Sequence, residues 1–369
     1  MNKTTPTLSQ ESIPLSPPSA VSPALQRVLA GDYGVDDLAG LLADGDPERD
    51  AALFAAANQV RAEHVGDSVH LRGLVEFSNH CGRTCQYCGL RAANKALQRY
   101  RMQPDEIVEA GLRAAALGYG TVVLQSGEDA WYRAEVIAGI VQRIKAQADV
   151  AVTLCLGERP REDYALWREA GADRYLLRIE TSNRELYAQL HPGMSFDHRL
   201  ACLGALRELD YQVGSGVLVG LPGQTLEMLA RDLLFLRDLP ADMVGLGPFI
   251  PHPGTPLAQA EAGRVPTVLR MVALTRLLLP DSHVVATTAL GSADPLGREK
   301  ALQAGANVMM PNVTPRAFRA LYEIYPDKIC TDEEPEHCRG CMAARIASLG
   351  RTIATGHGDA PRWLHSQRH

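Results

Sequence analysis

The chain has 369 residues, of which 46% are hydrophobic and 22% charged, the balance of an ordinary globular protein, which excludes wholesale disorder. The formal net charge of −6 argues against a broad surface for DNA or RNA. No apolar run approaches the roughly 18 residues that a membrane span needs, and the first residues lack the basic-then-apolar order of a secretory signal. We therefore expect a monomeric cytoplasmic protein with neither a nucleic-acid nor a membrane partner.

The N-terminal part of the chain divides into two segments of different composition. Residues 1–23 are rich in Ser and Pro and are expected to form a disordered lead-in. Over residues 24–67, apolar residues recur at helical spacing in three stretches, which end at Gly31, Gly45 and Gly66. Glycine is the usual C-terminal stop of a helix, so we predict a helical N-terminal extension.

From residue 68 onward, short apolar runs rich in β-branched residues alternate with stretches of helical spacing. Such runs indicate parallel strands that are buried on both faces of a sheet. Eight strands are predicted, at residues 69–78, 121–126, 149–156, 173–180, 212–220, 243–250, 283–290 and 306–312.

Eight strand–helix units predict an α/β fold of the (β/α)8 TIM-barrel type over residues 68–325, followed by a cysteine-containing segment over residues 326–369. An open, doubly wound sheet is the alternative, if one or two of the runs are pieces of buried helix. Barrels of this type collect their chemistry at the C-terminal ends of the strands, and polar or cysteine clusters do follow several of the predicted strands.

Three cysteines follow the first predicted strand, with the spacing Cys81-x3-Cys85-x2-Cys88. Three thiolates can hold three irons of a [4Fe-4S] cube and leave the fourth iron open to another ligand. Zinc with a distant His is an alternative, although zinc sites favour Cys-x2-Cys pairs. A disulfide framework is disfavoured, because the chain is large and a reducing compartment is expected.

This spacing at this place in a barrel resembles the radical S-adenosylmethionine (SAM) superfamily. The resemblance implies that the open iron binds SAM and that one electron from the cluster cleaves it to a 5′-deoxyadenosyl radical. It makes Cys81, Cys85 and Cys88 both the metal ligands and the catalytic centre. Tyr87 matches the aromatic residue that the superfamily places beside the adenine; simple packing of the loop is its alternative interpretation.

Several stretches, spread over roughly residues 45–350, resemble the HydE family of [FeFe]-hydrogenase maturases. They include VEFSNHCGRTCQYCGLRAANKALQRYRMQPDEIVEA, VVLQSGED, AGADRYLLRIETSN and NVTPRAFRALYEIYPDKICTD. The resemblance implies an enzyme that acts in assembly of the di-iron subcluster (H-cluster) of the hydrogenase. Its implied partners are sister maturases, a small iron–cysteine complex carrying carbonyl and cyanide as substrate, and an electron donor such as ferredoxin or flavodoxin.

The same resemblance implies a set of SAM-binding residues. Ser126-Gly127-Glu128 stands where the superfamily has Gly-Gly-Glu, whose backbone receives the SAM amino group. Arg199 is expected to bind the SAM carboxylate through its planar fork, with a surface ion pair as the alternative. Gly216 and Gly220 are expected to let the fifth strand approach SAM. The full predicted set is Tyr87, Gln125, Ser126, Thr153, Glu180 and Arg199.

Further resemblance points to four residues in the barrel lumen near the substrate: Arg72, Thr287, Thr288 and Tyr322. Arg72 lies within an apolar strand and needs a buried anion, which we expect to be the substrate. The threonine hydroxyls suit an anion or a cyanide nitrogen. Tyr322 could equally pack a helix.

A second cysteine triplet, Cys330-x7-Cys338-x2-Cys341, follows the eighth predicted strand. It resembles an accessory iron–sulfur site, so a possible second cluster is expected at the barrel surface, away from SAM. A zinc site with His337 is the alternative. Cys155 and Cys202 have no partners by spacing and are expected to be small buried residues, although Cys155 could face the lumen.

Two other functions are compatible with part of this pattern. A methylornithine-synthase-like or biotin-synthase-like radical SAM enzyme would share the barrel and the first triplet, but the second triplet and the RYRM and LQSGED stretches argue against it. A non-catalytic iron–sulfur carrier would not need the predicted SAM-binding residues. Cleavage of SAM to 5′-deoxyadenosine separates a carrier from an enzyme.

Overall fold

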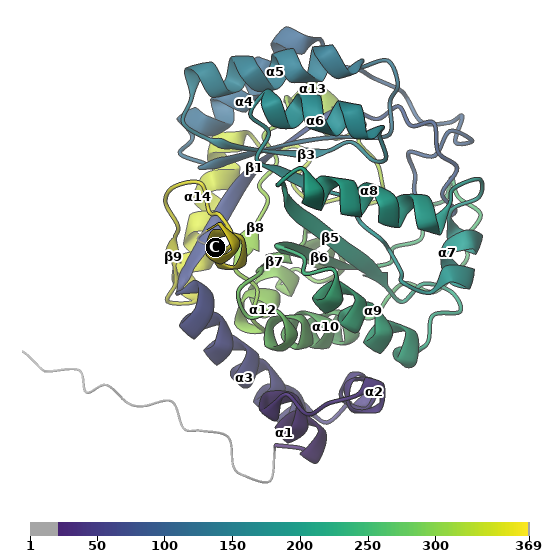
Figure 1. The fold of residues 1–369 in the computed structure, drawn as a ribbon, viewed down its shortest axis with the longest axis vertical. Coiled ribbons are helices and arrows are strands. Elements are labelled where there is room, and N and C mark those ends of the chain that lie inside the picture. The colour runs from purple at the N-terminus through teal and green to yellow at the C-terminus, as the bar shows by residue number, and fades with distance from the viewer. Residues whose placement is uncertain (1–20, 368–369) are drawn as a thin grey trace, which may run out of the picture.

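Eight parallel strands close into a barrel at the centre of the structure, a computed structural model that describes residues 21–367 (Figure 1). The strands pair in chain order from β2 to β8, and β1 closes the ring by pairing with both β8 and β2. This closure confirms the expected (β/α)8 barrel and excludes the open, doubly wound sheet. The strands are β1 (Ser68–Ser78), β2 (Thr121–Ser126), β3 (Ala151–Cys155), β4 (Arg174–Leu176), β5 (Gln212–Val219), β6 (Met243–Pro248), β7 (His283–Ala286) and β8 (Val308–Met309).

β4 and β7 each end four residues earlier than their apolar runs predict, and both changes fall at the cavity end of the barrel. β4 stops at Leu176, and Glu180 returns to the sheet through a single bridge to Val217. β7 stops at Ala286, because Thr288 already begins the short helix α11 (Thr288–Ala293). Each early end turns side chains toward the space above the strands.

Three helices precede the barrel: α1 (Pro23–Ala30), α2 (Val35–Ala43) and α3 (Pro47–Val65). The Ser22 side chain caps α1 and the Asp46 side chain caps α3, so both helices begin with the usual hydrogen-bonded N-cap. The predicted lead-in therefore ends before Pro23, and residues 1–20 lie outside the described part of the chain. α2 and α3 pack against the barrel helices α9 (Leu226–Asp238) and α10 (Val265–Leu278).

The remaining barrel helices cover the outside of the sheet (Figure 1). None of the helices in the described residues is long and apolar enough to cross a membrane. They are α4 (Pro104–Ala116), α5 (Ala134–Gln147), α6 (Arg161–Glu169), α7 (Arg184–Leu190), α8 (Phe196–Glu208), α9 (Leu226–Asp238), α10 (Val265–Leu278), α12 (Gly297–Gln303) and α13 (Arg316–Arg319).

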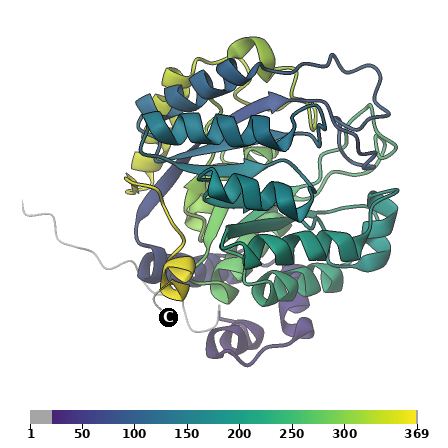
Figure 2. The ribbon, with the colours of Figure 1, turned by 45° about the horizontal axis from the view of Figure 1, so that its top comes forward.

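The C-terminal segment returns to the N-terminal end of the barrel. After α14 (Pro335–Ser348), the short strand β9 (Thr352–Ile353) pairs with the start of β1, and α15 (Pro361–Ser366) follows. Figure 2 shows this yellow segment at the end of the molecule from which the N-terminal helices lead into β1. The stretch between β9 and α15 contacts the barrel interior, as described below.

Candidate active site

A cavity of about 330 Å³ lies over the C-terminal ends of the strands. Its lining is mainly apolar, and Leu176, Met243 and Val285 belong to a small buried cluster that forms its floor. Fifteen side chains supply polar groups or thiols to the wall: Glu76, Tyr87, Cys88, Gln125, Cys155, Arg178, Glu180, Thr287, Thr288, Arg298, Asn312, Tyr325, Lys328, Cys330 and Cys338. An apolar cavity with a few polar groups is the usual form of a small-molecule site.

The loop that carries the first cysteine triplet is tied to three different parts of the barrel. The Gly82 amide donates to the Glu128 carbonyl at 2.9 Å, and the Gln86 amide donates to the Leu190 carbonyl at 2.8 Å. The Gly89 amide donates to the Ile324 carbonyl at 3.0 Å. These bonds fix the loop from both sides of the triplet, although the loop has no regular secondary structure of its own.

The three thiols of this loop are desolvated and influence one another. Burial, together with the neighbouring Cys81 thiol, raises the pKa of Cys85 to about 12. Burial also raises the pKa of Cys81 and of Cys88, and the other two thiols raise that of Cys88 further. Such thiols ionise only beside a strong positive charge, which an iron–sulfur cluster supplies.

The arrangement of these donors fits a cluster better than a single zinc ion. Within residues 21–367, no three His, Cys, Asp or Glu side chains are placed to share one metal ion. Thiolates on one zinc lie about 2.3 Å from the metal and therefore close to each other, whereas each thiolate of a cube binds a different iron. Cys81, Cys85 and Cys88 would thus hold a [4Fe-4S] cube without closing around it.

The segment Ser126-Gly127-Glu128 packs directly beneath the cysteine loop. A Cβ atom on Gly127 would lie 2.3 Å from the His80 carbonyl oxygen, so only glycine fits there. The Glu128 carboxylate is held by the protein: it pairs with Arg83 and accepts the Glu158 amide at 3.0 Å. The Glu128 side chain is therefore committed to partners within the protein.

Glu180 is aimed into the cavity by an unusual backbone conformation. Its φ of 65° lies in the left-handed region, which side chains other than glycine rarely adopt. Burial raises the pKa of its carboxylate, while the ion pair with Arg178 at 3.0 Å opposes this shift. Arg178 was not among the predicted residues, although its position two residues before Glu180 in the same predicted strand was a usable signal.

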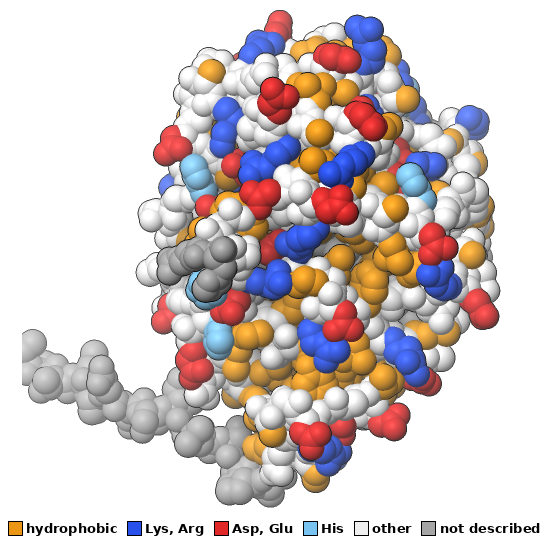
Figure 3. Space-filling model, viewed as in Figure 1, with side chains coloured by type: hydrophobic (Ala, Val, Ile, Leu, Met, Phe, Trp, Pro, Cys, Tyr) orange, Lys and Arg blue, Asp and Glu red, His pale blue; other side chains and the backbone are white. Residues whose placement is uncertain are grey.

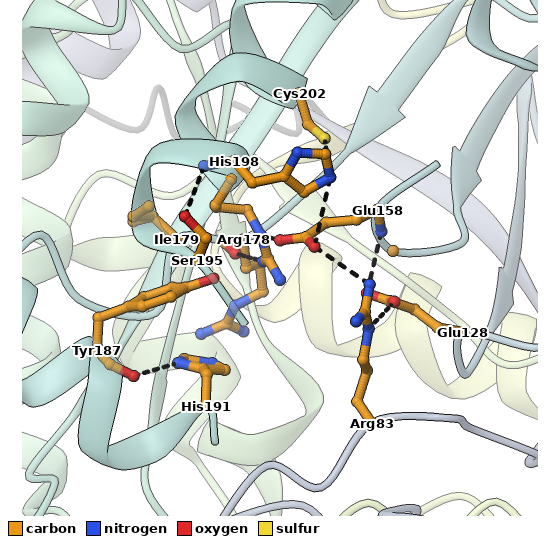
Figure 4. A network of polar contacts seen from close by, with 12 residues as sticks. Arg83, Glu128, Glu158, Arg178, Ile179, Tyr187, His191, Ser195, His198 and Cys202 are labelled. Atoms are coloured by element: carbon orange, nitrogen blue, oxygen red, sulfur yellow. Dashed lines mark hydrogen bonds and ion pairs between the residues drawn. The ribbon is translucent and has the colours of Figure 1, made fainter. Parts of the chain in front are cut away.

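Arg199 pairs with Glu158, which belongs to the network of ion pairs that Figure 4 draws around Arg83 and Glu128. It is 7% exposed, donates to Glu158 at 2.7 Å and also donates to the Arg178 carbonyl. Glu158 in turn contacts Arg83 at 3.2 Å, which links α8 to the cysteine loop. The surface-pair alternative for Arg199 is wrong, because the pair is buried. Glu158 itself carried no motif signal in the sequence.

Tyr87 borders the cavity and is held from behind by a histidine. Its hydroxyl lies 3.0 Å from His191 Nε2, and the two rings meet edge to face. Burial lowers the pKa of His191 to about 4, so this imidazole is neutral near pH 7. One face of Tyr87 thus borders the space above Cys88.

The other predicted SAM-binding residues occupy different depths of the barrel. Gln125 borders the cavity, and its Nε2 donates to the Tyr322 hydroxyl at 3.2 Å. Tyr322 is buried directly behind the wall instead of lining it. Thr153 is fully buried, and its hydroxyl finds no hydrogen-bond partner among the described residues. Ser126 is half-buried, with its hydroxyl turned back to the Gly127 carbonyl.

Thr287 and Thr288 both line the cavity, as the substrate hypothesis requires. The Thr287 hydroxyl already donates to the Leu246 carbonyl at 2.9 Å. This part of the lumen also holds a buried ion pair. Lys328 Nζ lies 2.6 Å from Glu76 Oε1 and neutralises the carboxylate. Neither partner of this buried pair was predicted, since the two residues lie 252 positions apart.

Arg72 does not reach the substrate cavity, so its predicted role is wrong. Its guanidinium contacts Met243 Sδ at 2.7 Å and donates to the Gly358 carbonyl at 3.1 Å. It therefore lies below the apolar floor, at the N-terminal end of the barrel. The C-terminal segment, distant in sequence, supplies the acceptor that we expected the substrate to provide.

The glycines of β5 are explained by neighbouring backbone. A Cβ on Gly216 would lie 1.9 Å from the Gly245 carbonyl oxygen of β6. Gly220 has a φ of 88°, and its Cβ would lie 2.3 Å from Gly263. Close packing of the chain on itself thus requires both glycines, whatever ligand lies above them.

The second cysteine triplet is closer to the cavity than expected. Cys330 and Cys338 line the cavity wall, and Cys341 is exposed on α14, where it accepts a hydrogen bond from Arg345 at 3.4 Å. The Cys338 thiol donates to Cys330 and lowers the pKa of Cys330. The expected surface position therefore holds for Cys341 alone. Of the two single cysteines, Cys155 faces the cavity and Cys202 is buried in α8.

The chain matches two family models and is similar in sequence to several known proteins. Residues 75–236 match the model of the radical SAM superfamily, and residues 247–330 match that of the biotin and thiamin synthesis associated domain. The chain is 52% identical to the [FeFe] hydrogenase maturase subunit HydE of Thermotoga maritima, over 92% of this chain and 97% of the relative. It is 30% identical to the 3-methylornithine synthase of Methanosarcina acetivorans, over 74% and 78% respectively.

Solved structures of other proteins share this fold. The crystal structure of a methylornithine synthase superposes with a TM-score of 0.79 at 25% identity and covers 93% of this chain and 98% of that one. A structure of the maturase HydG has a TM-score of 0.78 at 17% identity, over 95% and 78%, which shows a shared fold.

Proposed function

Because the chain belongs to the HydE family of radical SAM enzymes, we propose that it cleaves SAM reductively and acts in assembly of the di-iron subcluster of [FeFe]-hydrogenase. The observation that carries this proposal is the position of Cys88, which lines the same cavity as Tyr87 and Glu180 and lies close enough to Cys81 and Cys85 for these to raise its pKa. Methylornithine and biotin synthases match at 27–32% identity, against 52% for the maturase, so the maturase function is favoured.

Members of this family use a [4Fe-4S] cluster and SAM, and the first triplet would hold the cluster in this chain. When bound, the cluster supplies the electron that breaks the C5′–S bond of SAM, giving methionine and a 5′-deoxyadenosyl radical. The buried thiols of Cys81, Cys85 and Cys88 favour this group because their thiolates are costly without its positive charge.

The residues around the triplet would orient SAM through groups of complementary charge. Glu180 is the buried carboxylate of the cavity wall that suits the SAM amino group or the ribose hydroxyls. Arg199 would offer its remaining donors to the SAM carboxylate, while Glu158 fixes its orientation. Tyr87 would stack beside the adenine, held in place by His191.

The substrate proposed for the cavity is a small iron–cysteine complex with carbonyl and cyanide ligands, delivered by a sister maturase. Thr288 offers its hydroxyl to a cyanide nitrogen or a carboxylate oxygen, whereas the Thr287 hydroxyl is held by the Leu246 carbonyl. The apolar floor excludes water from the radical. The paired Glu76 and Lys328 leave this region without a large net charge.

The second triplet would hold an accessory iron–sulfur cluster. Cys330 and Cys338 both line the cavity, and the Cys338 thiol lowers the pKa of Cys330. Cys341 stands one helical turn after Cys338. His337 is exposed on α14, and a zinc site with His337 stays the alternative.

The test is maturation of an apo-hydrogenase by the reconstituted enzyme together with its sister maturases. The native protein should form 5′-deoxyadenosine and yield active hydrogenase. Formation of 5′-deoxyadenosine without hydrogenase activity, when the sister maturases are shown to be active, would contradict the maturase function but leave the radical SAM chemistry intact.

A further inference from the structure

We propose that the loop carrying the first cysteine triplet is the docking surface for a small acidic one-electron carrier protein, which binds over Cys81. The inference rests on the proposed function, because a centre that cleaves SAM reductively must receive one electron per turnover. The carrier is oxidised by one electron, and the centre held by the three cysteines is reduced by one.

The first observation is the charge of the loop. Residues 77–104 contain Arg83, Arg91, Lys95, Arg99 and Arg101 and not a single Asp or Glu, in a chain whose net charge is −6. On the face drawn in Figure 3, by contrast, basic and acidic side chains are intermixed. A concentration of one sign on one loop steers a partner of the opposite sign.

The second observation is that three of these cations lack an acidic partner. Arg83 pairs with Glu128, and Arg101 forms a two-pronged pair with Asp129. Within residues 21–367, Arg91, Lys95 and Arg99 form no ion pair at all. Arg91 donates to the Thr84 carbonyl, and Arg99 donates to the carbonyls of residues 79, 90, 91 and 94. Their positive charge is therefore available to another molecule.

The third observation is a surface cleft that leads from these cations to a cluster ligand. The cleft has a volume of about 320 Å³, and its lining includes Cys81, His80, Lys95 and Arg99 but no carboxylate. Arg99 donates to the carbonyls of Asn79 and Leu90, which flank the triplet on either side, so its guanidinium lies beside the cysteine loop. Cys81 belongs to this cleft, whereas Cys88 lines the SAM cavity. The centre thus has one side for SAM and another side for a partner.

The form of the cleft fits a transient partner. Weak electron-transfer complexes bury little surface and depend on charge, unlike permanent interfaces with large apolar cores. The other side chains that line the cleft are small or polar (Ala92, the buried Asn94 and the exposed Lys95), with Leu97 as the apolar exception. An acidic carrier with its cofactor at the surface satisfies both the charge and the need for a short path to Cys81.

The experiment follows SAM cleavage by the cluster-loaded enzyme with reduced flavodoxin as the electron donor. Lys95→Glu removes an exposed cation that makes no hydrogen bond among the described residues, and Lys95→Gln removes the charge alone. At low salt, Lys95→Glu should raise the KM for flavodoxin by about three- to tenfold, with a smaller rise for Lys95→Gln. The difference should shrink in about 1 M salt, where the screening length falls to about 3 Å.

Two controls separate docking from other effects. Photoreduced deazaflavin, a small uncharged donor, should drive SAM cleavage equally in native protein and both Lys95 variants, which tests the proposed function independently. Arg231→Glu, a charge reversal in the exposed pair with Glu227 on α9, should leave the KM for flavodoxin unchanged. An unchanged KM in Lys95→Glu, or an equal rise in Arg231→Glu, would overturn the proposal.

Discussion

The two ends of the barrel both bury arginines, but only one end keeps a cavity. At the N-terminal end, Arg72 and Arg174 are satisfied by the C-terminal segment: Gly358 offers its carbonyl to Arg72, and Asp359 pairs with Arg174. At the other end, Arg178 pairs with a carboxylate that itself lines the cavity. A buried arginine thus marks a ligand site only where no distant part of the chain reaches it.

The closed end should respond to mutation mainly through stability. Arg174→Met would leave Asp359 without its partner and strip donors from Thr121 and the His357 carbonyl. Removing one partner of a buried pair typically costs about 3–5 kcal/mol. We expect urea unfolding to show a loss of unfolding free energy near the lower end of this range, because Asp359 is partly exposed. SAM cleavage by the folded protein should be retained.

Arg161→Met is the matched control, since both side chains of the Arg161–Glu208 pair are exposed. It should cost less than about 1 kcal/mol. If Arg174→Met is no more destabilising than this control, the C-terminal segment does not hold the closed end together.

The open end should respond to pH. Asp232 on α9 accepts hydrogen bonds from Ser182, just after Glu180, and burial raises the pKa of Asp232 to about 6. Between pH 4 and pH 6 the folded protein holds this proton more tightly than the unfolded chain, so stability falls as the pH rises. The expected loss is up to about 3 kcal/mol, measured by urea unfolding across this range. Asp232→Asn should flatten that slope, and an unchanged slope would contradict the assignment.

A substitution of Arg178 tests how charge acts on the cavity end of the barrel. Arg178→Met should raise the pKa of Glu180 further, because the opposing positive charge is lost. We expect the Kd for SAM to rise about ten- to hundredfold, the value of a hydrogen bond to a charged group. The defect should grow as the pH falls, and Arg178→Lys should restore part of the affinity. A pH-independent defect would indicate that Arg178 acts only on the local fold.

The smallest effect is expected at Thr288. Thr288→Val removes one neutral hydroxyl from the cavity wall, a change of about 0.5–1.5 kcal/mol. Hydrogenase maturation should slow by about two- to tenfold, while 5′-deoxyadenosine formation stays at the native rate. An equal loss in both assays would place Thr288 in SAM binding instead of substrate binding.

The barrel and its cavity end were predictable, because the eight apolar runs and the clusters that follow them are local signals. The partners of buried charges were not predictable in the same way. Arg72 and Glu76 lie on one face of β1, four residues apart, yet their partners come from Gly358 and Lys328, far along the chain. A single sequence does not show which distant segment closes which end of a barrel.

Within the candidate site, motif residues were found and supporting residues were missed. Cys81, Cys85 and Cys88 carry a spacing that few other sites share, whereas Glu158 carries none. Glu158 becomes visible only when α8 brings Arg199 to the loop after β3. The early end of β4, which aims Glu180 at the cavity, is also a tertiary effect, since its sequence continues as an apolar run.

The central claim is that the first triplet alone holds the centre that cleaves SAM. The most direct test measures 5′-deoxyadenosine after anaerobic reconstitution, with deazaflavin as donor, in Cys85→Ser and in a variant with Ser at Cys330, Cys338 and Cys341. We predict background cleavage in Cys85→Ser, and most of the native cleavage with a partial loss of iron in the triple variant. Full cleavage in Cys85→Ser, or its loss in the triple variant, would contradict the claim.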